Sequence, residues 1–171
     1  MAKVCVFAGA RKGNDPIYMK SARKLGELIA SRGDHLYYGG SFVGCMGEIA
    51  KSALEAGGTV TGIIPKVFEH LITEEHENLE VIVTEDLFDR KRLMIEESDQ
   101  FFAFPGGLGT VDEILEVLTL NQIGIIEKPI TVLNLNGHFD WLNEKITLFQ
   151  KQGFMGVDCV KQLKIVNTVS Y

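Results

Sequence analysis

Short apolar runs alternate along this chain with longer segments in which apolar residues recur at helical spacing. The short runs have the length of β-strands, and several lack polar alternation, as strands buried on both faces of a parallel sheet do. The predicted strands are Val4–Ala8, His35–Tyr38, Val60–Ile64, Leu79–Val83, Gln100–Phe104 and Ile130–Leu135. The pattern therefore predicts strands that are connected by helices.

The helical segments between these strands have readable ends. Asp15 is a predicted N-cap followed by proline at the first helical position, and Arg32-Gly33 ends that helix. The other predicted helices are Gly44–Ala56, Asp86–Glu97, Thr110–Ile123 and Asp140–Gln152. Alternating strands and helices predict an α/β fold with one doubly wound, mostly parallel, Rossmann-like sheet. We expect a single domain over residues 1–171, with ligands beyond the carboxyl ends of the strands.

Composition and charge narrow the function classes. A formal net charge of -6 argues against a surface that collects nucleic acid, so an anionic ligand must be bound by local groups. The chain has no long apolar stretch, and we expect neither a membrane span nor a secretory signal. Cys5, Cys45 and Cys159 share no metal-site spacing, as is typical of a protein in the reducing cytoplasm.

The most informative motif is Pro105-Gly106-Gly107-Leu108-Gly109-Thr110, which directly follows a predicted buried strand. Glycines allow positive φ angles and let a ligand approach bare backbone. Thr110 is predicted to open a helix, whose free N–H groups and dipole favour an anion. We interpret the motif as a phosphate-binding turn. The alternative is a tight strand-to-helix turn that binds nothing.

Charged residues in two predicted helices are candidate catalytic or phosphate-binding residues. Glu113 lies about one turn into the helix after the glycine motif, and Glu116 follows at i+3 on a similar face. Arg90 and Lys91 lie in the first turns of the helix capped by Asp86. If the strands preceding these two helices are neighbours, Arg90 or Lys91 meets Glu113. Alternatively, Glu113 is only a helix-dipole partner and the basic run is a solvated face.

Other features exclude well-known sites. A second glycine cluster, Tyr38–Gly47, also joins a strand to a helix and is expected to border the same cleft, unless it is only a structural turn. Residues Gly9–Asn14 do not form G-x-G-x-x-G, and no P-loop is present, which disfavours a dinucleotide-dependent dehydrogenase and a P-loop nucleotidase. The histidines His35, His70, His76 and His138 are isolated and are interpreted as surface or loop residues, so no metal site is predicted.

Pro105–Glu113 resembles the PGGxGTxxE motif of the LOG ("Lonely guy") family, the cytokinin riboside 5'-monophosphate phosphoribohydrolases that are often labelled lysine decarboxylases. The resemblance covers nearly the whole chain. Val6–Gly9 is similar to the family's first strand and Tyr38–Gly47 to its GGGxxGxMG segment, while Arg90-Lys91 resembles its RK pair and Thr119–Gly124 its T-W-A-Q-L-G stretch.

This resemblance implies hydrolysis of the N-glycosidic bond of an adenosine-type 5'-monophosphate to free base and ribose 5-phosphate. It implies that Arg90 and Glu113 are the catalytic pair. The implied substrate-binding residues are Lys91, Gly106, Gly107, Gly109, Thr110, Glu116, Thr119, Gly39, Gly40 and Met46. It further implies a nucleotide substrate, no metal or organic cofactor, and a homodimer.

The chain departs from the family pattern at several positions. Ala10-Arg11 stands in place of a serine pair, Ser41 in place of a third glycine, Phe88 in place of a histidine and Leu120 in place of a tryptophan. Both AMP and an N6-prenylated AMP therefore stay open as substrates. The alternative function is a non-catalytic protein that binds a phosphorylated ligand or molybdenum cofactor, as related Rossmann-like proteins do. A pyridoxal phosphate-dependent decarboxylase is disfavoured because no lysine has a recognisable Schiff-base setting.

Overall fold

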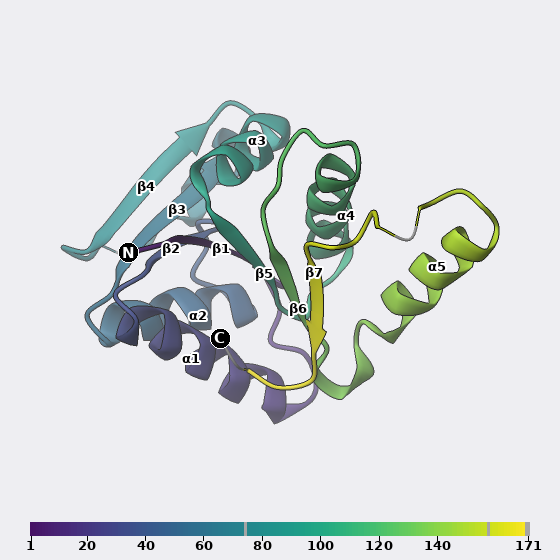
Figure 1. Cartoon of the computed structure of the whole chain (residues 1–171). Coiled ribbons are helices and arrows are strands. Elements are labelled where there is room, and N and C mark those ends of the chain that lie inside the picture. Colours follow the sequence, from purple (N-terminus) through teal and green to yellow (C-terminus); the bar gives the residue numbers. More distant parts are fainter. Residues whose placement is uncertain (74, 157, 170–171) are drawn as a thin grey trace.

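The computed structural model describes residues 1–73, 75–156 and 158–169. Strands and helices alternate along the chain (Figure 1). The strands are β1 (Lys3–Phe7), β2 (His35–Tyr38), β3 (Thr59–Pro65), β4 (Leu79–Thr84), β5 (Gln100–Ala103), β6 (Ile130–Leu133) and β7 (Leu163–Val166). The α-helices are α1 (Pro16–Ser31), α2 (Gly44–Glu55), α3 (Leu87–Glu97), α4 (Leu108–Gln122) and α5 (Asp140–Lys151), with two short 3₁₀ segments, η1 (Lys66–Leu71) and η2 (Leu135–Gly137).

All seven strands form one parallel sheet in the order β4-β3-β2-β1-β5-β6-β7. The chain builds outward from β1 to β4, then returns through α3 to β5, which pairs with β1 in the register Phe7↔Ala103. The winding direction therefore reverses between β1 and β5, and the predicted doubly wound, Rossmann-like α/β class is confirmed. In such sheets the carboxyl ends of the strands beside this reversal form the usual ligand crevice.

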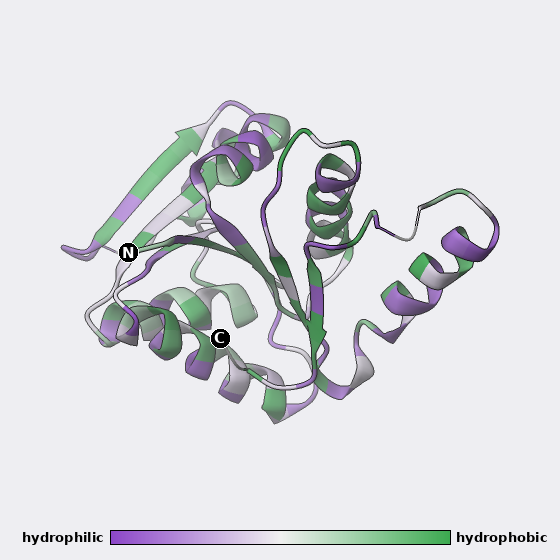
Figure 2. Ribbon diagram, in the orientation of Figure 1, coloured by the Kyte–Doolittle hydropathy of each residue, from purple (hydrophilic) through white to green (hydrophobic). Residues whose placement is uncertain are grey.

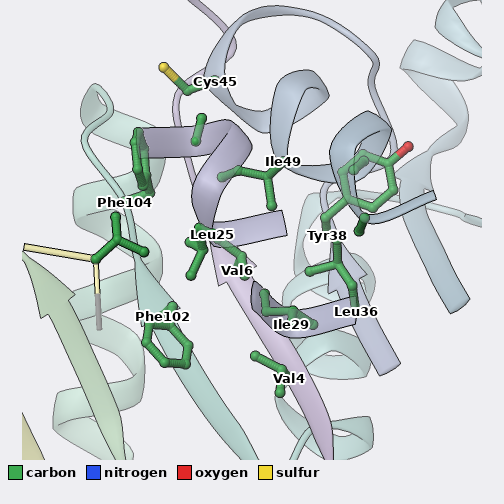
Figure 3. Close-up of a cluster of buried hydrophobic side chains, with 14 of the residues drawn as sticks. Val4, Val6, Leu25, Ile29, Leu36, Tyr38, Cys45, Ile49, Phe102 and Phe104 are labelled. Carbon is green, nitrogen blue, oxygen red and sulfur yellow. The ribbon is translucent and has the colours of Figure 1, made fainter. Parts of the chain in front are cut away.

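Two hydrophobic clusters cover the two faces of the sheet. Alternate residues of β1 point to opposite faces, so Val4 and Val6 pack under α1 and α2, whereas Cys5 and Phe7 pack under α3, α4 and α5. Figure 3 shows the first cluster, in which Leu25 of α1 lies near Val6 and Phe102. Because both faces are covered, the central strands are apolar throughout, which explains their lack of polar alternation.

Two expectations about the elements are wrong. The seventh strand β7 was not predicted; it is short and only partly buried at the sheet edge, so its apolar signal is weak. Helix α4 begins at Leu108, two residues before the predicted start at Thr110. Gly107 is its N-cap, so the glycine motif itself supplies the first turn of the helix.

The four helices nearest the sheet centre begin in two different ways. Asp15 caps α1 through the amide of Ile17 at 2.8 Å, and Asp86 caps α3 through two amides. By contrast, α2 and α4 begin after Val43 and Gly107, and neither has a side-chain cap. The first N–H groups of a helix have no partner within it. Groups from outside these helices can therefore bind the first amides, as the carbonyls of Arg11 and Gly9 do at α2.

No helix in the described ranges combines the length and the apolar character that crossing a membrane requires.

Candidate active site

A cavity of about 630 Å³ lies where the predicted ligand crevice is expected. Residues at or after the carboxyl ends of β1, β2, β3 and β5 line it, together with the first turns of α2, α3 and α4. The predicted residues Arg90, Glu113 and Thr110 all contribute to its wall. Helices α2 and α4, which both lack a side-chain cap, begin at this cavity. The cavity thus combines the glycine motifs with a pair of charged residues.

Arg90 and Glu113 form an ion pair in the wall of the cavity. Arg90 Nη1 donates to Glu113 Oε1 at 2.9 Å, and the two side chains are 13% and 8% exposed. Arg90 Nε also donates to the carbonyl of Ile63 at the end of β3, at 3.0 Å. The guanidinium is therefore held by two acceptors, and its orientation is defined.

Burial gives the Glu113 carboxyl group an unusual proton affinity. Burial raises its pKa above the ordinary value of 4.5, while the positive charge of Arg90 opposes that rise. A carboxylate in this setting can stabilise positive charge on a sugar ring or remove a proton from water. The charge of Arg90 favours the ionised form that both tasks need.

Gly39, predicted to bind substrate, lines the cavity at the point where Arg90 and Met46 converge. A Cβ atom at position 39 would overlap with Arg90 Nη2 and lie 2.5 Å from Met46 Sδ. The absence of a side chain therefore makes room for the guanidinium. Gly40 does not line the cavity: it has φ +82°, and its Cα faces Ile64, so its role is in the turn.

The glycines of the Pro105–Thr110 turn act through space rather than through positive φ. Gly106, Gly107 and Gly109 all lack positive φ angles, which corrects the expectation for this turn. A Cβ atom on Gly106 would overlap with Thr110 Oγ1. Around Gly107 and Gly109, by contrast, a Cβ atom would meet nothing within 4 Å. Their bare backbone faces open space at the uncapped start of α4, where a ligand can reach the amides.

His138 was interpreted as a surface or loop residue, but the structure places it in the cavity wall. Its Nε2 lies 2.9 Å from the carbonyl oxygen of Gly106, and its ring packs edge-on against Phe139. Because position 138 is far from position 106 in the chain, no local pattern could have revealed this contact. A second tie holds the turn from the other side, where Gly9 donates its amide to the carbonyl of Pro105 at 3.2 Å.

Besides Gly40, three predicted substrate-binding residues lie outside the cavity wall: Lys91, Glu116 and Thr119. Lys91 Nζ lies 2.9 Å from Asp112 Oδ2 and 2.6 Å from Glu116 Oε2, so it joins α3 to α4. Thr119 Oγ1 donates to the carbonyl of Leu115 within α4. Burial lowers the pKa of Lys91, but the Glu116 and Asp112 carboxylates outweigh it and raise that pKa. In this chain Lys91 and Glu116 tie α3 to α4, and Thr119 bonds within α4, so none of the three borders the cavity.

Within residues 1–73, 75–156 and 158–169, no group of three or more His, Cys, Asp or Glu side chains is arranged to hold a metal ion.

Comparison with known proteins gives consistent matches over most of the chain. A family model described as "possible lysine decarboxylase" matches residues 46–171. A probable cytokinin riboside 5'-monophosphate phosphoribohydrolase from Oryza sativa subsp. japonica is 41% identical over 160 residues, covering 92% of this chain and 70% of that protein. A cytokinin riboside 5'-monophosphate phosphoribohydrolase from Rhodococcoides fascians is 41% identical over 153 residues, covering 89% and 77%.

The solved structures similar to this chain include a molybdenum cofactor binding protein from Rippkaea orientalis. It matches with a TM-score of 0.72 and 29% identity, covering 98% of this chain and 90% of that one. The same fold is thus found in proteins whose names give them different ligands.

Proposed function

This chain belongs to the LOG family of cytokinin riboside 5'-monophosphate phosphoribohydrolases. We propose that the residues of its cavity catalyse hydrolysis of the N-glycosidic bond of an adenosine-type 5'-monophosphate. The products are the free base and ribose 5-phosphate. The observation that carries the proposal is the ion pair between Arg90 and Glu113 in the cavity wall, beside the uncapped N-terminus of α4.

The geometry suggests a division of labour. The 5'-phosphate binds at the amides of the Gly107–Thr110 turn, and this remote binding energy positions the ribose. As the glycosidic bond breaks, positive charge develops on the ribose ring and negative charge on the departing base. Glu113 stabilises the ring charge or takes a proton from the attacking water. Arg90 orients the carboxylate and offsets negative charge nearby.

The cavity does not favour the decarboxylase label. A pyridoxal phosphate enzyme needs a lysine amine at the site for its Schiff base. None of the described residues that line this cavity is a lysine. Lys91, which is next to Arg90 in the chain, is engaged by Asp112 and Glu116. Hydrolysis of a nucleotide therefore suits the site better than amine chemistry does.

Incubation of the purified protein with AMP and with N6-isopentenyl-AMP tests the proposal directly. We expect release of free base and ribose 5-phosphate, detected by chromatography. The second candidate, a carrier of molybdenum cofactor, is favoured by the Rippkaea orientalis structure. Tight binding of a phosphorylated ligand without turnover of either nucleotide would support the carrier and contradict the enzyme.

The wall of the cavity also supports a proposal about the base. Ile64, Pro65, Phe68, Leu71 and Leu87 form an apolar flank on the β3 side. Apolar walls favour an apolar substituent on the ligand. We therefore expect the N6-prenylated nucleotide to have the higher kcat/KM, and AMP nucleosidase activity to be the weaker of the two.

A homodimer is supported by exposed apolar residues on α3 and α4. Phe88 and Leu108 are 78% and 89% exposed, and Leu115 follows on the same side of α4. Figure 2 shows hydrophobic residues along much of α4. Lys91 joins the two helices, and its ammonium group also lies over the Phe88 ring. Large exposed apolar side chains are typical of interaction surfaces. Light scattering on the wild-type protein and on a Phe88→Ser, Leu108→Ser variant tests the dimer.

We also propose that the protein is cytoplasmic. Its three cysteines are all free, which suits a reducing compartment. Fractionation of cells that express the tagged protein tests this location.

A further inference from the structure

We propose that Arg11 is a specificity-determining residue that pairs with the phosphate of the ligand and so selects phosphorylated over unphosphorylated ribosides. The inference rests on the proposed function only in assuming a phosphorylated ligand at the start of α4. Arg11 stands where the family pattern has a serine, so nothing in that pattern assigns it a role.

The charges around the cavity single out this residue. Among the described residues that line it, only Arg11, Arg90 and Glu113 have formally charged side chains. Arg90 and Glu113 lie 2.9 Å apart and offset each other. Arg11 is exposed, and in the described part of the chain its side chain forms no ion pair. It therefore contributes the uncompensated positive charge of the cavity.

The backbone of Arg11 is fixed beside the phosphate turn. Cys45 at the start of α2 donates its amide to the carbonyl of Arg11 at 3.3 Å, and Met46 donates to the carbonyl of Gly9 at 3.0 Å. On the other side, Gly9 donates to the carbonyl of Pro105 at 3.2 Å. The loop is thus held between α2 and the Pro105–Thr110 turn.

The same contacts indicate which helix receives the anion. The carbonyls of Gly9 and Arg11 occupy the first amides of α2, so that N-terminus is already used. The N-terminus of α4 has no side-chain cap and faces open space at Gly107 and Gly109. An anion therefore binds at α4. Arg11 belongs to the loop that is hydrogen-bonded to the Pro105–Thr110 turn at the start of this helix.

The charge of a phosphate monoester favours a cation beside the N-terminus of α4. A phosphate monoester carries about −1.5 to −2 charges at neutral pH, whereas a helix N-terminus supplies only about +0.5. The net charge of -6 gives no general attraction for an anion. A guanidinium matches phosphate geometry with two parallel hydrogen bonds. Among the charged residues of the cavity wall, Arg11 is the cation that no carboxylate offsets, so it can supply that charge.

Calorimetric titration with ribose 5-phosphate and, separately, with adenosine tests the inference without requiring turnover. We expect Arg11→Gln to weaken binding of ribose 5-phosphate roughly tenfold and to leave adenosine binding unchanged. Arg11→Lys should recover part of the loss. Lys12→Gln is the matched control, because Lys12 is the adjacent cation but does not line the cavity. Added salt should weaken phosphate binding more in the wild type than in Arg11→Gln.

Unchanged ribose 5-phosphate binding in Arg11→Gln would overturn the inference, as would an equal loss with adenosine or no binding by the wild type. Arg11-dependent binding of ribose 5-phosphate in a protein that releases no base from any nucleotide would support the inference while refuting the proposed hydrolase.

Discussion

Arg90 of α3 and Glu113 of α4 are joined by a 2.9 Å hydrogen bond, although the strands that precede these helices are separated in the sheet by three others. The sequence predicts this contact only if those two strands are neighbours, and that condition is wrong. The contact forms because α3 crosses back over the sheet from β4 to β5, which brings Arg90 beneath the end of β3. The long return connection therefore builds the site.

The first prediction concerns Glu113. We expect Glu113→Gln to lower kcat about 10²- to 10⁴-fold, because the amide neither stabilises a cationic ring nor accepts a proton from water. Binding of ribose 5-phosphate should change little, since the phosphate turn is intact. Glu144→Gln, at an exposed position of α5 outside the cavity wall, is the control. A parallel loss of binding would make Glu113 a ligand-holding residue instead.

Removal of the Arg90 charge should shift the pH profile. Burial already raises the pKa of Glu113 above 4.5, and Arg90 opposes that rise. In Arg90→Met the positive charge that lowers the pKa of Glu113 is lost. The pKa of Glu113 therefore rises further, and its carboxyl group stays protonated to higher pH. We expect the acid limb of kcat/KM to move to higher pH, as measured by rate profiles. Arg92→Met, whose side chain is 66% exposed and paired with Asp89, should leave the limb in place.

Two adjacent glycines should respond in opposite ways to alanine. Gly106→Ala should lower the free energy of unfolding by about 1–3 kcal/mol, because its Cβ would overlap with Thr110 Oγ1. Gly107 has φ −97° and open space around it, so Gly107→Ala should fold normally. Its methyl group would instead obstruct the phosphate and raise KM. Thermal unfolding and steady-state kinetics on both variants separate the two effects, and equal destabilisation would contradict this assignment.

Lys91 should act on the site from outside it. We expect Lys91→Met to lower the free energy of unfolding by about 1 kcal/mol, between the values for surface and buried ion pairs. Because the tie between α3 and α4 loosens, kcat should fall with little change in KM. Lys91→Arg should restore much of the loss. A rise in KM at unchanged kcat would show instead that Lys91 contacts substrate.

Much of the local structure follows from the sequence. Asp15 and Asp86 mark the starts of α1 and α3 because a capping carboxylate acts on amides two or three residues away. Apolar runs identify the inner strands because burial on both faces leaves few polar positions. The sequence also predicts β4, although this edge strand is only partly buried. The glycine motif after β5 is equally local. Its helix begins at Leu108, two residues before the predicted start at Thr110, because Gly107 is the N-cap.

Which of these predicted residues contact one another depends on the packing of distant segments. Strand order depends on pairing between distant segments, and no periodicity encodes it. The crossover of α3 turns Arg90 toward Glu113 and Lys91 toward Asp112, although the two basic residues are adjacent in the chain. Successive helical residues point about 100° apart, so one joins the cavity and the other the helix interface. Local chemistry therefore determined the candidates, and packing between distant segments determined their roles.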